Sequence, residues 1–130
     1  MTSFEQAPLT ELDNFLSPEN GKTFYFRTQD GVRLRVSIWN QSPSKGSILL
    51  QSGRTEFIEK YFEVIKEFID RGFCVAMFDW RGQGMSERLI TDQNKAFVED
   101  FKDHDNDLSF ILENILYHPN IYYFGKYLIY

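Results

Sequence analysis

Six consecutive apolar residues, 73–78, run through the middle of the sequence without the alternation of a half-exposed strand. Such a run is typical of a parallel strand that is buried on both faces. Apolar residues at helical spacing precede it over 57–69, and Gly72 predicts the end of that helix. Because parallel strands need a crossover, usually a helix, the run predicts an α/β chain.

Further segments continue this pattern along the chain. A short apolar strand is predicted over 46–52, a second helix over 97–115 and a last strand over 127–130. Strands that alternate with helices indicate right-handed crossovers and a largely parallel sheet. The functional groups of such sheets gather at the carboxyl ends of the strands.

An antiparallel hairpin is predicted before the first parallel strand. The runs 22–28 and 32–39 are rich in β-branched and aromatic residues, and Asp30-Gly31 between them is a strong hairpin turn signal. The second run alternates, with one set of side chains facing one way and the other set facing the opposite way. The first set is Val32, Leu34, Val36 and Ile38, and the second is Arg33, Arg35 and Ser37.

Composition excludes several classes of protein. The 130 residues fit one domain or part of one, which we place at 22–130 after an N-terminal extension, 1–21. A net charge of −5 argues against nucleic acid as the main partner, and the single Cys74 excludes a disulfide framework. With no basic residue in 1–15 and no transmembrane run, we expect a soluble, cytoplasmic protein, and a peripheral place at the inner membrane surface stays open.

The stretch 79–86, Asp-Trp-Arg-Gly-Gln-Gly-Met-Ser, follows the buried run directly. Gly82 and Gly84 allow a tight turn with positive φ angles. A dinucleotide-binding fingerprint is excluded, because Glu87 stands where a third small residue is needed. A serine-nucleophile turn is excluded as well, because Arg88 replaces its second glycine.

The segment 92–114 holds seven acidic and two basic residues, an excess equal to the whole net charge. A calcium loop starting at Asp103 lacks the required glycine and glutamate, so we interpret the acids as the solvated face and first turns of a helix. His104 and His118 are expected at the surface, and neither has metal-ligand spacing, so no metal site is predicted.

Residues 51–56 lie where a strand turns into a helix. Backbone N–H groups at a helix start are unpaired and carry partial positive charge, so this turn could hold an oxyanion. An ordinary strand-to-helix connection explains the position equally well.

Together these segments resemble the N-terminal half of the α/β-hydrolase family, nearest to lysophospholipases of the L2 type and monoacylglycerol lipases. The matching stretches are 51–61, 71–73, 79–86 and 101–108, and the resemblance covers 22–130. It implies an incomplete α/β-hydrolase sheet, in which a β-hairpin is followed by a parallel strand-helix-strand-helix-strand unit.

The resemblance also implies a function for the whole protein, the hydrolysis of carboxylic esters of lipids by a Ser–Asp–His triad through an acyl-enzyme. It implies a lipid ester as the substrate, with no cofactor. It further implies that the backbone N–H of Arg54 serves as an oxyanion-hole donor. The turn beside the nucleophile is structural in the family, and here its residues are Asp79, Arg81, Gly82, Gly84 and Ser86.

The family's nucleophile motif, Gly-x-Ser-x-Gly, occurs nowhere in the 130 residues. In the family it follows the fifth strand, which we place at 127–130, and His104 and His118 precede that position in the wrong order for the triad. We therefore expect a chain that is truncated before the nucleophile and is inactive alone. A second hypothesis is a stand-alone, non-catalytic α/β domain that binds a partner.

Overall fold

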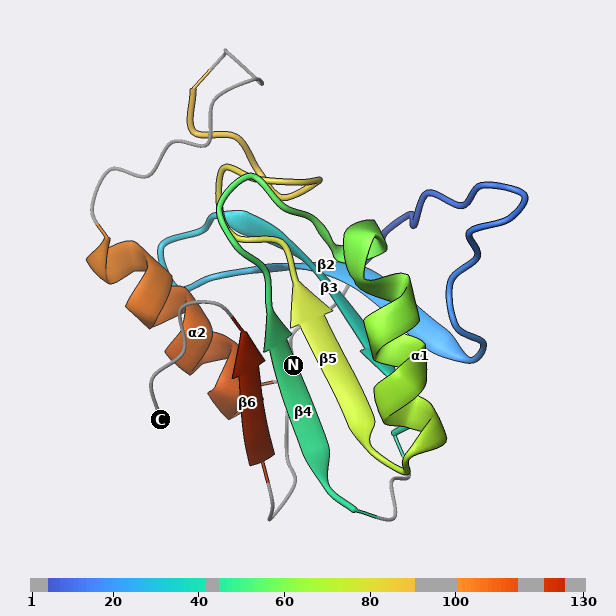
Figure 1. Cartoon of the computed structure of the whole chain (residues 1–130). Coiled ribbons are helices and arrows are strands. Elements are labelled where there is room, and N and C mark those ends of the chain that lie inside the picture. The colour runs from blue at the N-terminus through green and yellow to red at the C-terminus, as the bar shows by residue number, and fades with distance from the viewer. Residues whose placement is uncertain (1–4, 42–44, 91–100, 115–120, 126–130) are drawn as a thin grey trace.

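The computed structural model describes residues 5–41, 45–90, 101–114 and, for the backbone, 121–125. They form one mixed sheet of six strands in the order β1-β2-β3-β5-β4-β6 (Figure 1). The elements in chain order are β1 (Glu5–Gln6), β2 (Gly21–Arg27), β3 (Arg33–Trp39), β4 (Ser47–Gln51), the 3₁₀ helix η1 (Ile58–Tyr61), α1 (Phe62–Asp70), β5 (Cys74–Phe78), α2 (Lys102–Asn114) and β6 (Ile121–Gly125).

The predicted hairpin is formed by β2 and β3, which pair in register from Gly21 opposite Trp39 to Arg27 opposite Arg33. Gly31 turns the chain with a φ of 84°, a conformation that glycine adopts without steric cost. β3 then pairs antiparallel with β5, so the hairpin is joined to the parallel part of the sheet.

The parallel part consists of β5, β4 and β6, and every residue of β4 and β5 is buried. This confirms the strands predicted at 46–52 and 73–78. Alternate side chains of each strand pack on opposite faces. Leu49 and Ala76 pack with Ile111 of α2, whereas residues from the alternate positions of both strands pack on η1 and α1. The latter residues are Leu50, Val75 and Met77.

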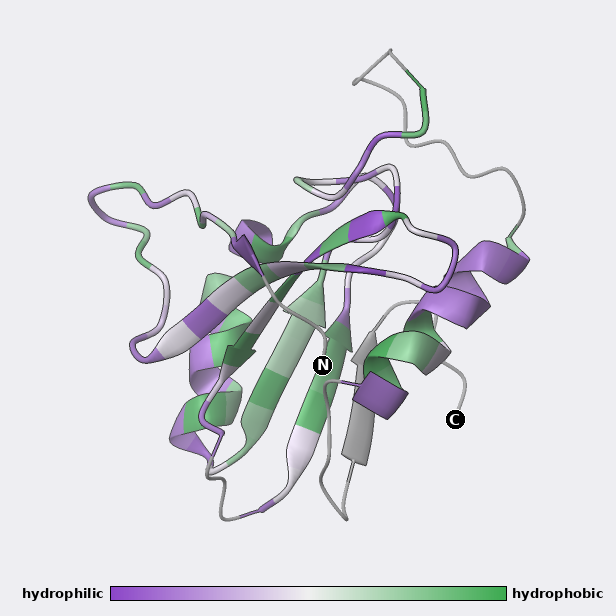
Figure 2. Ribbon diagram, turned by 180° about the vertical axis from the view of Figure 1, so that it is seen from behind, coloured by the Kyte–Doolittle hydropathy of each residue, from purple (hydrophilic) through white to green (hydrophobic). Residues whose placement is uncertain are grey.

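The two helices therefore cover opposite faces of the sheet, and Figure 2 shows the mostly apolar β4 and β5 between them. The helical spacing over 57–69 is confirmed by η1 and α1, which end just before Gly72. Neither these helices nor α2, within the described part of the chain, combines the length and apolar character needed to cross a membrane.

The last described strand, β6, lies at Ile121–Gly125 and pairs with β4 from Ser47 opposite Ile121 to Gln51 opposite Gly125. The strand predicted at 127–130 lies outside the described residues. The described strand that pairs with β4 is β6, which comes earlier in the chain. β1, within the N-terminal extension, pairs with β2. The order of hairpin, strand, helix, strand, helix and strand agrees with the order predicted from the sequence.

Candidate active site

The candidate site lies where the loops that follow β4 and β5 meet. Both strands end at the same edge of the sheet because they are parallel neighbours. The Trp80 indole N–H donates to the Ser52 carbonyl at 3.0 Å. The Thr55 backbone N–H donates to Gln83 Oε1 at 2.6 Å, so the two loops are directly hydrogen-bonded.

The loop after β4 is organised by Glu56. Its Oε1 accepts a hydrogen bond from the Gly53 N–H at 2.6 Å and one from the Tyr61 hydroxyl at 2.7 Å. Its Oε2 pairs with Lys60 Nζ at 2.7 Å. The contacts with Lys60 and then Tyr61 lower the pKa of Glu56 to about 2, so this carboxylate is ionised at neutral pH.

Arg54 lies between these anchored residues. Its side chain is exposed, and among the residues that the structure describes none accepts a hydrogen bond from its backbone N–H. The next residue, Thr55, has a φ of 63°, which places it in the left-handed region that β-branched residues rarely adopt. The geometry thus leaves one donor of this loop available at the carboxyl end of β4.

The turn after β5 is built around the buried carboxylate of Asp79. Oδ1 accepts from the Ile58 N–H at 3.0 Å, and Oδ2 accepts from the Met85 N–H at 2.9 Å. Gly84, with a φ of 52°, packs so tightly on this carboxylate that an added Cβ would overlap its carboxyl carbon. Gly82 also has a positive φ, of 77°.

Ser86 is buried at the end of this turn and is bonded to the backbone on both sides. Its hydroxyl accepts from the Arg35 N–H at 2.9 Å and donates to the Asp79 carbonyl at 2.6 Å. A nucleophilic serine needs a general base and access to substrate, and neither contact provides a base.

Arg35 forms a buried ion cluster beneath the site. Its guanidinium contacts Asp79 through Nε at 2.8 Å, and it reaches both oxygens of Glu59 at 2.8 and 2.6 Å. Burial opposes the ionisation of Glu59, yet the hydrogen bonds from Arg35 hold the pKa of this carboxyl below its usual value. The alternation in β3 is confirmed, but its Arg35 face is covered by protein.

Arg81 connects the turn to the hairpin and to α2. It is 4% exposed and makes two hydrogen bonds to Asp107, at 2.8 and 2.7 Å, and two to Asp30, at 2.9 and 3.0 Å. The Arg81 guanidinium lowers the pKa of Asp30 to about 2. The acids of α2 are therefore not all solvated, because Asp107 is 1% exposed and serves as a structural ion-pair partner.

The sequence predicted His104 at the surface, but the structure shows that its side chain is half-buried. Its ring centre lies 4.7 Å from that of Trp80, and burial, followed by the charge of Arg81, lowers its pKa. His118 lies outside the described residues. No group of three or more metal-ligating side chains occurs within the described parts of the chain.

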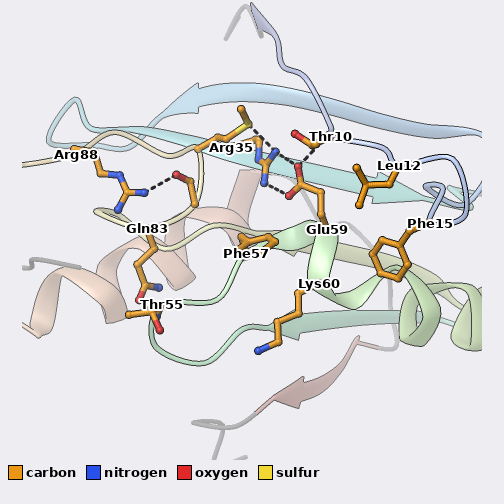
Figure 3. Close-up of a pocket in the computed structure, with 12 residues that line it drawn as sticks. Thr10, Leu12, Phe15, Arg35, Thr55, Phe57, Glu59, Lys60, Gln83 and Arg88 are labelled. Carbon is orange, nitrogen blue, oxygen red and sulfur yellow. Dashed lines mark hydrogen bonds and ion pairs between the residues drawn. The ribbon is translucent and has the colours of Figure 1, made fainter. Parts of the chain in front are cut away.

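A cavity of about 720 Å³ opens beside the Arg35–Glu59 pair, and Figure 3 shows both side chains at its wall. The N-terminal segment, the loop after β4 and the turn after β5 all contribute to it. Its lining residues are Thr10, Leu12, Phe15, Arg35, Thr55, Phe57, Glu59, Lys60, Gln83, Gly84, Met85 and Arg88. Polar and apolar side chains are mixed in this lining.

Two buried polar groups at the end of β4 complete the site. Gln51 Nε2 and Ser52 Oγ have no hydrogen-bond partner among the described residues. Gln51 pairs with Gly125, so both groups lie at the edge where β6 ends.

Sequence patterns did not predict that Arg35 and Glu59 form an ion pair. The available signal was an arginine among the apolar residues of β3.

Comparisons with known proteins agree with this architecture. The model of the family described as serine aminopeptidase, S33, matches residues 42–125. A probable lysophospholipase L2 of Haemophilus influenzae is 32% identical over 114 residues, which are 86% of this chain and 35% of that protein. Lysophospholipase L2 of Escherichia coli K12 is 37% identical over 84 residues, 65% of this chain and 25% of the relative.

Solved structures share the fold at low identity. A soluble variant of the Saccharomyces cerevisiae monoglyceride lipase, crystallised with a substrate analogue, is 22% identical, with a TM-score of 0.59 over 83% of this chain and 34% of that one. DcsB in complex with its substrate analogue is 20% identical, with a TM-score of 0.66 over 82% and 36%. The chain spans about a third or less of each of these four proteins. It belongs to the α/β-hydrolases of the serine aminopeptidase S33 family.

Proposed function

We propose that residues 22–130, after the extension 1–21, are the front portion of a serine hydrolase that cleaves carboxylic esters of lipids. The observation that carries this proposal is the backbone N–H of Arg54 at the carboxyl end of β4, which has no acceptor among the residues that the structure describes. The L2-type lysophospholipases among the relatives support a lipid ester as the substrate. The same proposal locates the protein in the cytoplasm, with a peripheral position at the inner membrane surface as the alternative.

In this proposal the Arg54 N–H donates to the oxygen that becomes negative when the ester carbonyl is attacked. A donor that is fixed before the reaction stabilises the transition state without reorganisation. The turn after β5 would then serve only to hold the neighbouring loop. Its residues, Asp79, Arg81, Gly82, Gly84 and Ser86, make contacts of that kind with backbone and ion-pair partners.

The missing nucleophile motif supports inactivity of the chain alone. In the family this motif follows the fifth strand, and Gly-x-Ser-x-Gly occurs nowhere in the 130 residues. An oxyanion donor without a nucleophile and base gives only a weak residual effect.

Hydrolysis of a short p-nitrophenyl ester by the purified 130-residue chain tests this proposal. We expect no turnover above buffer, from the wild-type chain or from the Ser86→Ala variant. Robust turnover that is lost in Ser86→Ala would contradict both the inactivity and the structural role of Ser86. Sequencing the DNA downstream of the Tyr130 codon tests the parent enzyme, since the proposal requires a Gly-x-Ser-x-Gly motif to be encoded there.

A second candidate is a stand-alone domain that binds a basic partner. The exposed Asp105 and Glu113 on α2 favour it, because the excess acidic charge of the chain gathers around this helix. A pull-down that saturates with one defined partner at low salt, and weakens on Glu113→Gln, would support this candidate.

A further inference from the structure

Three successive backbone N–H groups in the loop after β4 have different surroundings. The first, of Gly53, is bound to Glu56 Oε1 at 2.6 Å, and the third, of Thr55, is bound to Gln83 Oε1 at 2.6 Å. The middle one, of Arg54, has no acceptor among the described residues. Both short contacts are made by side-chain oxygens, so side chains rather than a backbone ladder decide which N–H groups of this loop are bound.

Glu56 is suited to this task because its charge is compensated. A bare carboxylate near a developing oxyanion would repel it. Here one carboxylate oxygen pairs with Lys60 Nζ at 2.7 Å, and the other also accepts the Tyr61 hydroxyl at 2.7 Å. The Glu56 side chain is 15% exposed, whereas Lys60 is 57% exposed at the rim.

Gln83 holds the other side of the loop from a separate strand connection. It is 5% exposed, and its own position is set by the turn, where its N–H donates to the Trp80 carbonyl at 2.9 Å. The residue that it binds, Thr55, has a φ of 63°. Because a β-branched residue seldom adopts this conformation unaided, the surroundings must maintain it.

We propose that Glu56 and Gln83 are positioning residues that hold the peptide 53–55 so that the Arg54 N–H alone is presented to the substrate oxyanion. This inference rests on the proposed hydrolase function, because that function gives the Arg54 N–H its role as a donor to the oxyanion. The arrangement itself concerns only hydrogen bonds in the chain. Neither residue touches the substrate in this role.

Amide hydrogen exchange measured by NMR on the ¹⁵N-labelled 130-residue chain tests the arrangement. In the wild type we expect the Gly53 and Thr55 amides to exchange at least about tenfold more slowly, relative to their intrinsic rates, than the Arg54 amide. Gln83→Leu removes the acceptor and should speed exchange at Thr55 about tenfold and shift the Arg54 resonance. Gln83→Glu keeps an oxygen acceptor at the same place and should restore both signals.

Glu56 is tested in the same way. Glu56→Leu should release the Gly53 amide, whereas Glu56→Gln retains an acceptor oxygen and should keep most of its protection. Glu63→Gln, an exposed change on α1, serves as the control and should leave all three amides unchanged. The amides of β4 and β5 report whether each variant is folded, and the two conservative variants carry the test if a leucine variant is not.

Equal protection of the three amides in the wild type would overturn the proposal. The proposal would also be overturned if the Arg54 resonance in Gln83→Glu or Glu56→Gln had the same position as in the leucine variant of the same residue. None of these readouts involves turnover. A parent protein without ester hydrolysis would therefore refute the proposed function, while the exchange pattern would still test the hydrogen-bond arrangement of the loop.

Discussion

Arg35 Nε donates a hydrogen bond to Asp79 Oδ2 at 2.8 Å, and both side chains are fully buried. The contact joins the middle of β3 to the start of the turn after β5. Since Asp79 also accepts from the backbone N–H groups of Ile58 and Met85, one carboxylate connects the hairpin, the start of η1 and the turn after β5.

Asp79→Ala should therefore be strongly destabilising. The variant leaves the Arg35 charge buried with one partner fewer and two backbone donors without an acceptor, so we expect a loss of about 3–5 kcal/mol in the free energy of unfolding. Urea denaturation measures it. The control is Asp70→Ala, whose pair with Lys66 is exposed on α1 and is worth about 0–1 kcal/mol. Similar losses in both variants would contradict the central place of Asp79.

Gly84→Ala should cost more stability than Gly31→Ala. Both glycines have positive φ, so both variants carry a backbone strain of about 1–2 kcal/mol. A Cβ at Gly84 also meets the Asp79 carboxylate, whereas at Gly31 nothing lies within 4 Å. The difference between the two melting curves isolates the close contact. Equal losses would show that the turn can relax away from Asp79.

Ser86→Ala should lower the free energy of unfolding of the chain. The change leaves the buried Arg35 N–H without its acceptor and removes the donor to the Asp79 carbonyl, a loss of about 1–3 kcal/mol. Urea denaturation beside Ser109→Ala, an exposed serine on α2, measures it. An unchanged midpoint in Ser86→Ala would argue that its hydroxyl is not held as the geometry indicates.

The Arg81–Asp30 pair should make stability depend on acidity. Arg81 lowers the pKa of Asp30 in the fold to about 2 from 3.8, so its contribution is present above the unfolded value and is lost as the pH falls through the folded one. In urea titrations, the stability gap between wild type and Asp30→Asn should be constant near neutral pH and close between about pH 4 and 2. A gap that is independent of pH would exclude the charge of Asp30 as its cause.

The sequence alone determined the local elements and their order. Apolar period and turn residues located β2 to β5, η1 and α1, because backbone propensity and amphipathic spacing are local properties. Asp30-Gly31 marked the hairpin, and the Asp79 to Ser86 stretch marked a tight turn. The structure pairs β4 with Ile121–Gly125, and the strand predicted at 127–130 lies outside the described residues. Aromatic residues occur both in 122–124 and in 127–130, so local composition does not identify which stretch pairs with β4.

Only the tertiary structure decided which charges are buried and with which partners. Arg35 and Arg81 read as ordinary polar positions, yet they meet carboxylates that lie 44 and 26 residues away in the chain, in Asp79 and Asp107. Such pairs exist because the sheet order places β3 next to β5 and α2 against the turn. The spacing of residues along a chain predicts which face of a helix or strand each side chain lies on. The partners of an ion pair depend on how helices and strands that are distant in the sequence pack together.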